Sequence, residues 1–144
     1  MNQEQSQMMG AFLWGKKADT NLLKSDLTEN QDSLLAECVW QNGNKHSRSF
    51  CFNKADKLVI EDDMATTSDS YATLVLHPAC QVKVENGKAV IQRGAITVCI
   101  ETNIEPTIEK CWYSEEYGKE NETHKLCYPL NDNILKTTIW IEKY

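Results

Sequence analysis

The pair Asn86-Gly87 separates two short runs in which apolar and polar residues alternate, 81–85 before it and 88–92 after it. Asn-Gly between alternating runs is the strongest short-range signal for a β-hairpin. With a two-residue loop, Val84 lies opposite Ala89 and Val82 lies opposite Ile91, so that one face of the hairpin is apolar. The chain is therefore expected to form an antiparallel sheet with one buried face.

Strand-like runs recur along the rest of the sequence, with turn residues between them. They are rich in β-branched and aromatic residues and occupy 33–40, 47–52, 57–61, 70–77, 95–101, 106–113, 126–128 and 136–142. About eleven strands at a spacing of roughly 8–12 residues are typical of an all-β, antiparallel β-sandwich. Residues 20–32 are ambiguous, because Leu22, Leu23 and Leu27 fit either one helical turn or a strand. We predict a single domain over residues 1–144.

The segment 114–125 interrupts this pattern. It consists mostly of Glu, Lys, Asn and Gly, and long segments without regular structure tend to be functional or flexible. Its composition favours a flexible charged loop.

The charge of the chain excludes some partners. The formal net charge is −6 and the pI is about 5.1, without a cluster of Lys and Arg, so we expect no nucleic-acid partner. No apolar run approaches ~18 residues, so we expect no transmembrane helix and no membrane partner. Residues 1–9 are polar and lack the features of a signal peptide. As written, the chain is expected to be cytoplasmic.

The sequence contains no recognisable pattern of metal-binding residues. Six cysteines are dispersed without a Cys-x-x-Cys pair, so zinc-ligand spacing is absent and buried thiols are favoured over disulfides. The triplet Glu61-Asp62-Asp63 is interpreted as the solvated end of a strand, because hard cations take six or more oxygen ligands. We predict no cofactor and no metal.

Aromatic residues offer the clearest candidates for ligand contact. The four tryptophans are Trp14, Trp40, Trp112 and Trp140. In a strand-rich chain most tryptophans are expected to fill a core. The pair Trp112-Tyr113, beside the charged segment, is the least core-like and is our first choice for a surface on which a sugar stacks.

Nucleophilic catalysis has no recognisable motif here. The three histidines are His46, His77 and His124, and the chain has no Gly-x-Ser-x-Gly sequence. Gly-rich phosphate-binding loops are also absent.

Six short motifs occur in order over nearly the whole chain: QSQMMGAFLWGKKA at 5–18, HSRSF at 46–50, LVIED at 58–62, LHP at 76–78, YSEEYG at 113–118 and KTTIW at 136–140. The later ones resemble the patterns h-R-x-f, l-x-v-x-D, f-H-x-x-P, Y-S-x-x-Y-G and T-T-x-I of the heparinase II/III-like polysaccharide lyases. Each motif is weak by itself, and their shared order carries the resemblance. The match covers only the C-terminal β-sandwich domain of that family.

The resemblance implies a supersandwich-like fold and a family reaction. Family members cleave uronic-acid polysaccharides such as glycosaminoglycans by β-elimination, and they join an α/α-toroid domain to this β domain. Their catalytic Asn, Tyr and His residues, and the metal positions of some members, lie upstream of the matching region. No catalytic residue is therefore carried over, and proton abstraction needs a base that this chain does not supply.

These points predict a non-catalytic C-terminal domain that supports an upstream toroid and lines one wall of a cleft for acidic polysaccharide. A longer lyase of this kind would be periplasmic or secreted. The residues expected to contact carbohydrate are Trp112, Tyr113, Tyr117 and His77.

Three further readings stay open. A free-standing carbohydrate-binding module would show three or more exposed tryptophans or tyrosines in a row. An unfamiliar enzyme site would group His77 and His46 with nearby acids. An exposed sheet edge would also allow a homodimer.

Overall fold

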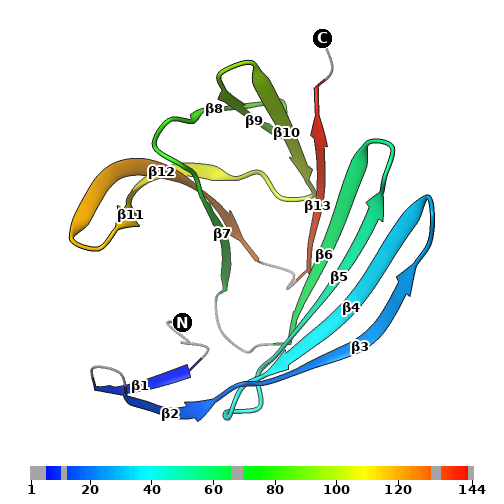
Figure 1. The fold of residues 1–144 in the computed structure, drawn as a ribbon, viewed down its shortest axis with the longest axis vertical. Helices are drawn as coiled ribbons and strands as arrows, with labels where there is room; N and C mark the ends of the chain where they lie inside the picture. The colour runs from blue at the N-terminus through cyan, green and yellow to red at the C-terminus, as the bar shows by residue number, and fades with distance from the viewer. Residues whose placement is uncertain (1–5, 11–12, 66–69, 131–133, 143–144) are drawn as a thin grey trace.

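The computed structural model describes residues 6–10, 13–65, 70–130 and 134–142. These residues form thirteen strands and no helix, and the paired strands run antiparallel. Figure 1 shows the strands as curved sheets around a concave interior. The prediction of an all-β antiparallel sandwich is confirmed. In this part of the chain no helix is long and apolar enough to cross a membrane.

The largest sheet has eight strands in the order β3-β4-β5-β6-β13-β10-β9-β8. Their bounds are Asp19–Leu27 (β3), Gln31–Val39 (β4), Lys45–Asn53 (β5), Lys57–Ala65 (β6), Ile134–Ile141 (β13), Ile96–Thr102 (β10), Lys88–Arg93 (β9) and Gln81–Glu85 (β8). Strand β13 pairs with β6 on one side and with β10 on the other. It therefore joins two meanders, β3 to β6 and β8 to β10, into one sheet.

Two smaller sheets complete the structure. A three-stranded sheet has the order β11-β12-β7, with bounds Thr107–Glu116 (β11), Lys119–Pro129 (β12) and Tyr71–Val75 (β7). A two-stranded sheet pairs Ser6–Gly10 (β1) with Leu13–Lys17 (β2).

The Asn-Gly hairpin has the predicted register. Val82 pairs with Ile91, and Val84 pairs with Ala89. Asn86 and Gly87 have φ angles of 52° and 75°. Positive φ at both central residues is the requirement of a type I′ turn, whose twist matches that of the flanking strands.

The hydrophobic core lies where the three-stranded sheet packs against the β13-β10-β9 part of the large sheet. Leu126 of β12 is completely buried. The other buried members are Leu76, Ala89, Ile91, Ile100, Tyr128, Leu130 and Leu135. Burial raises the pKa of Tyr128 to about 12, because the phenolate would lose its hydration.

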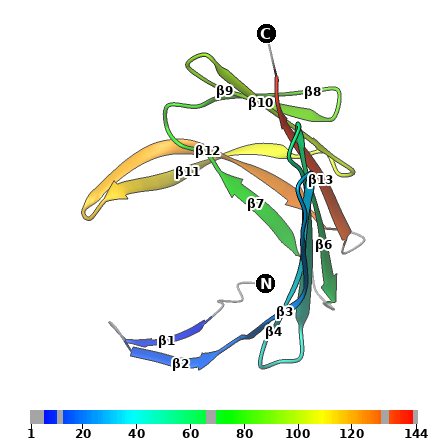
Figure 2. The same cartoon turned by 45° about the vertical axis from the view of Figure 1, so that its right-hand side comes forward.

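The face of the large sheet that carries this core extends beyond it. Leu135 pairs with Asp62, Asp62 with Arg48, Arg48 with Ala36, and Ala36 with Leu22. Directly paired residues lie on the same face of a sheet. Leu135 is 3% exposed, whereas Leu22 is 63% exposed. The three-stranded sheet therefore covers one half of this face, and the half over β3, β4 and β5 stays open (Figure 2). We call this open half the concave face.

One sequence interpretation needs correction, and one ambiguity is resolved. Segment 114–125 is not an irregular loop: β11 extends to Glu116 and β12 begins at Lys119, so the segment forms the end of a hairpin around Tyr117-Gly118. Cross-strand ion pairs stabilise it, including Lys110 with Glu122 at 2.7 Å. The ambiguous segment 20–32 is strand β3, a turn and the start of β4.

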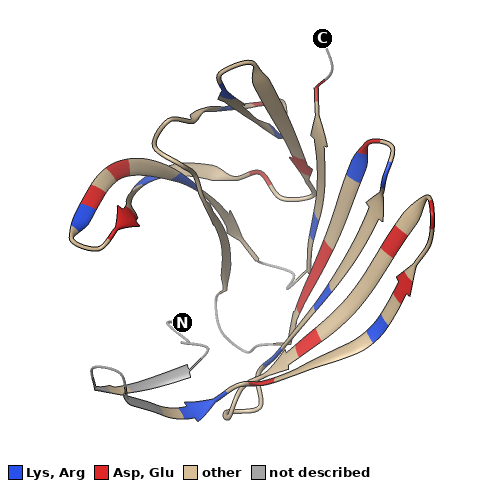
Figure 3. Ribbon diagram, viewed as in Figure 1, with Lys and Arg blue, Asp and Glu red and all other residues tan. Residues whose placement is uncertain are grey.

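Charged side chains of both signs are interspersed over the strands. Figure 3 shows Lys and Arg beside Asp and Glu on β3 to β6 and on the β11–β12 hairpin. Such mixing fits the expectation of a chain without a single basic surface.

Candidate functional site

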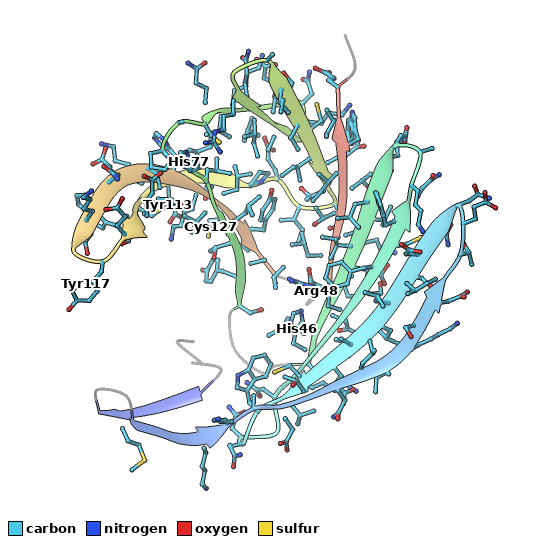
Figure 4. The ribbon with its side chains drawn as sticks, in the orientation of Figure 1. His46, Arg48, His77, Tyr113, Tyr117 and Cys127 are labelled. Carbon is cyan, nitrogen blue, oxygen red and sulfur yellow. The ribbon has the colours of Figure 1, made fainter. Side chains whose placement is uncertain are left out.

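A cluster of three polar side chains lies on the concave face. Strand β5 carries His46 and Arg48 two residues apart, so both point to the same side of the sheet. The neighbouring strand β6 places Asp62 opposite Arg48. One oxygen of Asp62, Oδ1, lies 2.5 Å from His46 Nε2 and 2.5 Å from Arg48 Nε. Figure 4 shows His46 and Arg48 directed into the interior.

Burial and charge fix the protonation of Asp62. The side chain of Asp62 is 6% exposed, whereas that of Arg48 is 43% exposed. Burial by itself would raise the pKa of Asp62, but the hydrogen bonds from His46 and Arg48 and their charges lower it below its usual value. Asp62 is therefore an ionised acceptor that holds both donors in place.

A shallow groove of about 410 Å³ adjoins this cluster. Its lining residues are Thr20, Asn21, Leu22, Ala36, Glu37, Cys38, His46, Arg48 and Phe50. Leu22, Ala36 and Phe50 supply apolar side chains to the wall, and Arg48 supplies a guanidinium that is always ionised. Glu37 is ion-paired with Lys45.

Trp40 adjoins the cluster from the end of β4. Its ring stacks on the His46 ring with centroids 6.5 Å apart and an interplanar angle of 22°. The Trp40 indole N–H is buried and has no hydrogen-bond acceptor among the described residues. A buried donor without an acceptor is uncommon in folded proteins.

A second cluster surrounds His77, just after β7. The backbone N–H of Ala79 donates to His77 Nδ1 at 3.0 Å, and His77 Nε2 lies 2.7 Å from Glu115 Oε1. Because Nδ1 accepts, the neutral ring carries its proton on Nε2 and donates it to Glu115. The ring also packs against Tyr113, with centroids 5.4 Å apart. These contacts give His77 a structural role in the turn that connects β7 to β8.

The four predicted carbohydrate-contacting residues do not form one surface. Trp112 and Tyr113 are adjacent in β11, so their side chains point to opposite faces of the sheet. Trp112 is 66% exposed, Tyr113 packs against His77, and Tyr117 projects from the hairpin tip (Figure 4). The structure thus brings together only His77 and Tyr113. No row of three exposed aromatics is present among the described residues.

The three tryptophans whose side chains are described lie outside the core cluster. Trp112 is exposed, and Trp40 and Trp140 are half-buried and outside the core cluster. Trp140 lies on the opposite face of the large sheet from Arg48, with the ammonium groups of Lys57 and Lys88 5.9 and 5.1 Å from its ring centroid. The side chain of Trp14 lies outside the described part of the chain.

The sequence did not reveal the role of Asp62. We interpreted it as part of a solvated strand end, whereas β6 continues to Ala65 and buries Asp62 between Glu61 and Asp63, both of which are exposed. The sequence signal that could have identified Asp62 was the alternation of side chains along a strand. His46 and Arg48 lie on one face of their strand, so an acid that pairs with both must lie on the same face of the neighbouring strand. Choosing Asp62 as that acid requires the register between β5 and β6, which sequence patterns rarely determine.

The cysteines and acids of the described residues offer no metal site. All six cysteines are free, and Cys99 and Cys127 are buried. Burial raises the pKa of both thiols, which makes them poor thiolate ligands at neutral pH. No group of three or more His, Cys, Asp or Glu in the described ranges is arranged to hold a metal ion. His46 and His77 lie in separate clusters (Figure 4).

The sheets and their open face define an all-β, sandwich-like domain. The chain belongs to the heparinase II/III-like C-terminal family, whose model matches residues 1–141. No curated protein sequence matches the chain. The recognition of this family from short motifs in the sequence is thus confirmed.

Solved structures share the fold. A heparinase III, the BT4657 gene product, has a TM-score of 0.74 at 16% identity over 89% of this chain. The heparan sulfate lyase HepC from Pedobacter heparinus has a TM-score of 0.73 at 14% identity over 87% of this chain. The chain spans 22% of the length of each of these proteins.

Proposed function

We propose that this chain is the non-catalytic sheet domain of a polysaccharide lyase and that its concave face contacts an upstream domain and borders the cleft for acidic polysaccharide. Membership of the heparinase II/III-like C-terminal family supports the proposal. The span of 22% of the heparinase III chain leaves room for the catalytic part of a lyase elsewhere.

The observation that carries the proposal is the apolar surface on the concave face. Leu22, Leu27, Leu34 and Phe52 are 63%, 70%, 37% and 43% exposed. All four lie on one face, because Leu22 pairs with Ala36, Leu34 with Phe50, and Leu27 and Phe52 both pair with Asp32. Contiguous exposed apolar residues rimmed by polar ones mark a surface that another domain or a ligand covers.

A bulge in β3 produces this arrangement. Leu22 and Leu27 are five residues apart and would point to opposite faces of a regular strand. The register of β3 against β4 shifts between Leu22 and Lys24, so the extra residue returns Leu27 to the face of Leu22.

Catalysis by the chain alone is the outcome that the proposal excludes. The purified chain is incubated with heparan sulfate, heparin, hyaluronan and alginate, and the absorbance of unsaturated uronate is followed. We expect no enzyme-dependent rise with any of these substrates. An enzyme-dependent rise would show that the chain carries its own base and would overturn the proposal. The His46→Ala and His77→Ala variants would then show whether either histidine is that base.

A further inference from the structure

The guanidinium of Arg48 is bound to Asp62 at one edge and lies over the Phe50 ring, 5.8 Å from its centroid, and its other edge has no hydrogen-bond partner among the described residues. Its Nε donates to Asp62 Oδ1, and the Arg48 side chain is 43% exposed beside the groove. Arginine has five N–H donors in a planar fork, and no other hydrogen bond or ion pair of Arg48 exists within the described ranges. The two terminal amino groups therefore remain available to an acceptor in the groove.

The surroundings of Arg48 restrict the chemistry of that acceptor. Asp62 is already paired with Arg48 and His46, and Glu37, which follows Ala36 in β4 and therefore points to the opposite face, is paired with Lys45. The fork of an arginine fits a carboxylate or sulfate through two parallel hydrogen bonds. The apolar side chains of Leu22, Ala36 and Phe50 offer packing for the C–H face of a sugar ring beside the guanidinium.

We propose that the groove beside Arg48 is a binding subsite for one anionic group of an acidic sugar, with the Arg48 guanidinium as its anchor and Asp62 as the residue that positions it. The ligand class rests on the proposed function above, whereas the site itself rests on the groove and on the geometry of Arg48. The group bound by Arg48 would be an oxyanion, either the planar carboxylate of a uronate or the tetrahedral sulfate of a sulfate ester.

The chain itself supplies a reporter for this site. The Trp40 ring stacks on His46, which shares its Asp62 acceptor with Arg48. The Trp40 indole N–H resonance in a ¹H–¹⁵N spectrum is identified by its loss in Trp40→Phe. Occupation of the groove is expected to shift this resonance, because ring stacking and the unsatisfied N–H make it sensitive to its surroundings.

The test is a titration of the purified chain with three hexasaccharides: unsulfated heparosan, heparin and neutral chitohexaose. We expect the Trp40 resonance to shift with the acidic sugars and to stay in place with chitohexaose. Heparosan acting as well as heparin identifies the carboxylate as the bound group, and a shift with heparin alone identifies the sulfate. No saturable shift with either acidic sugar would overturn the proposal.

Variants separate the anchor from general charge effects. Arg48→Gln is expected to weaken binding by about 10-fold to 100-fold, the range for a lost charge-assisted pair of hydrogen bonds. The matched control is Arg93→Gln, because Arg93 is the other arginine of the chain and lies on β9, outside the groove. It is expected to bind like the unaltered chain.

A second variant guards against loss of the fold in Arg48→Gln. Ala36 lines the groove from β4, so Ala36→Phe is expected to fill the groove and to leave the Arg48–Asp62 pair in place. We expect it to abolish the shift while the spectrum stays dispersed. Unchanged binding in a folded Ala36→Phe or Arg48→Gln protein would exclude the groove. This result is independent of the lyase assay, so failure of the subsite and failure of the proposed function are distinguishable.

Discussion

Asp62 shows how one buried carboxylate organises a polar cluster. It accepts hydrogen bonds from two donors through a single oxygen and is almost fully buried. Hydrogen bonds to a charged partner contribute about 1.5–3 kcal/mol each when the partner is not left unsatisfied. The cluster therefore ties β5 to β6 at the point where the core ends and the concave face begins.

Replacing Asp62 by Asn removes the charge and keeps the shape. We expect the free energy of unfolding to fall by about 1.5–3 kcal/mol at neutral pH, because His46 and Arg48 lose an ionised acceptor. Urea unfolding measures this change. Asp63→Asn, an exposed neighbour on the opposite face, is the control and should change stability by less than about 0.5 kcal/mol.

The same cluster predicts a pH dependence. The folded pKa of Asp62 lies below its ordinary value, so the folded state holds fewer protons than the unfolded state in the acid range. The stabilisation is complete above the unfolded value, near 4, and is lost as the pH falls through the lower folded value. Stability curves of the unaltered chain and of Asp62→Asn should therefore converge below that range. Parallel curves would contradict this assignment.

His77 is expected to act on stability rather than on chemistry. Its Nδ1 accepts from the backbone of Ala79, and its contact with Glu115 is partly exposed. His77→Ala should cost about 1 kcal/mol, whereas Glu115→Gln should cost less than about 0.5 kcal/mol because exposed pairs contribute little. Thermal unfolding of both variants measures the difference. Equal losses would place the ion pair, not the turn, at the centre of this cluster.

At the scale of elements, the β8–β9 hairpin is the best local test. Gly87 has a φ of 75° and open space around it, so a side chain there meets backbone strain rather than a clash. Gly87→Ala is expected to lower the free energy of unfolding by about 1 kcal/mol. Glu85→Ala, next to the turn and exposed, should change it by less than about 0.5 kcal/mol. Chemical denaturation compares the two.

Strand β3 presents a long edge with exposed leucines. Every residue of β3 is exposed, and Leu23 and Leu27 are 54% and 70% exposed. Unpaired strand edges with apolar side chains favour self-association. The charge of Lys24 and the bulge in β3 oppose this self-association, but the exposed leucines remain beside the edge. Leu27→Glu is expected to reduce concentration-dependent association in sedimentation experiments, whereas Ile96→Glu, at an apolar site that is 57% exposed and away from this edge, should leave it unchanged.

On the scale of the whole molecule, local patterns revealed the strands but not their neighbours. The Asn-Gly pair fixed the register of its hairpin, because turn type and alternation act over ten residues. The hairpin at 114–125 was missed, since its residues are mostly charged or polar and carry few apolar side chains. The contact of Asp62 with Arg48 depends on cross-strand register, and the open concave face depends on where the smaller sheet ends. A local sequence pattern predicts neither the register nor the extent of the smaller sheet.

The position of β13 has a consequence for how this chain acquires its structure during synthesis. The strands from β3 to β6 and those from β8 to β10 are each contiguous in sequence, but only β13 connects them. Among the described strands β13 is the last to be synthesised, so the two halves keep open edges until it is made. Their joining closes contacts between residues more than 70 positions apart (Lys57 with Trp140). An arrest of translation before residue 134 would therefore leave two separate meanders exposed to proteases, rather than a slightly smaller domain.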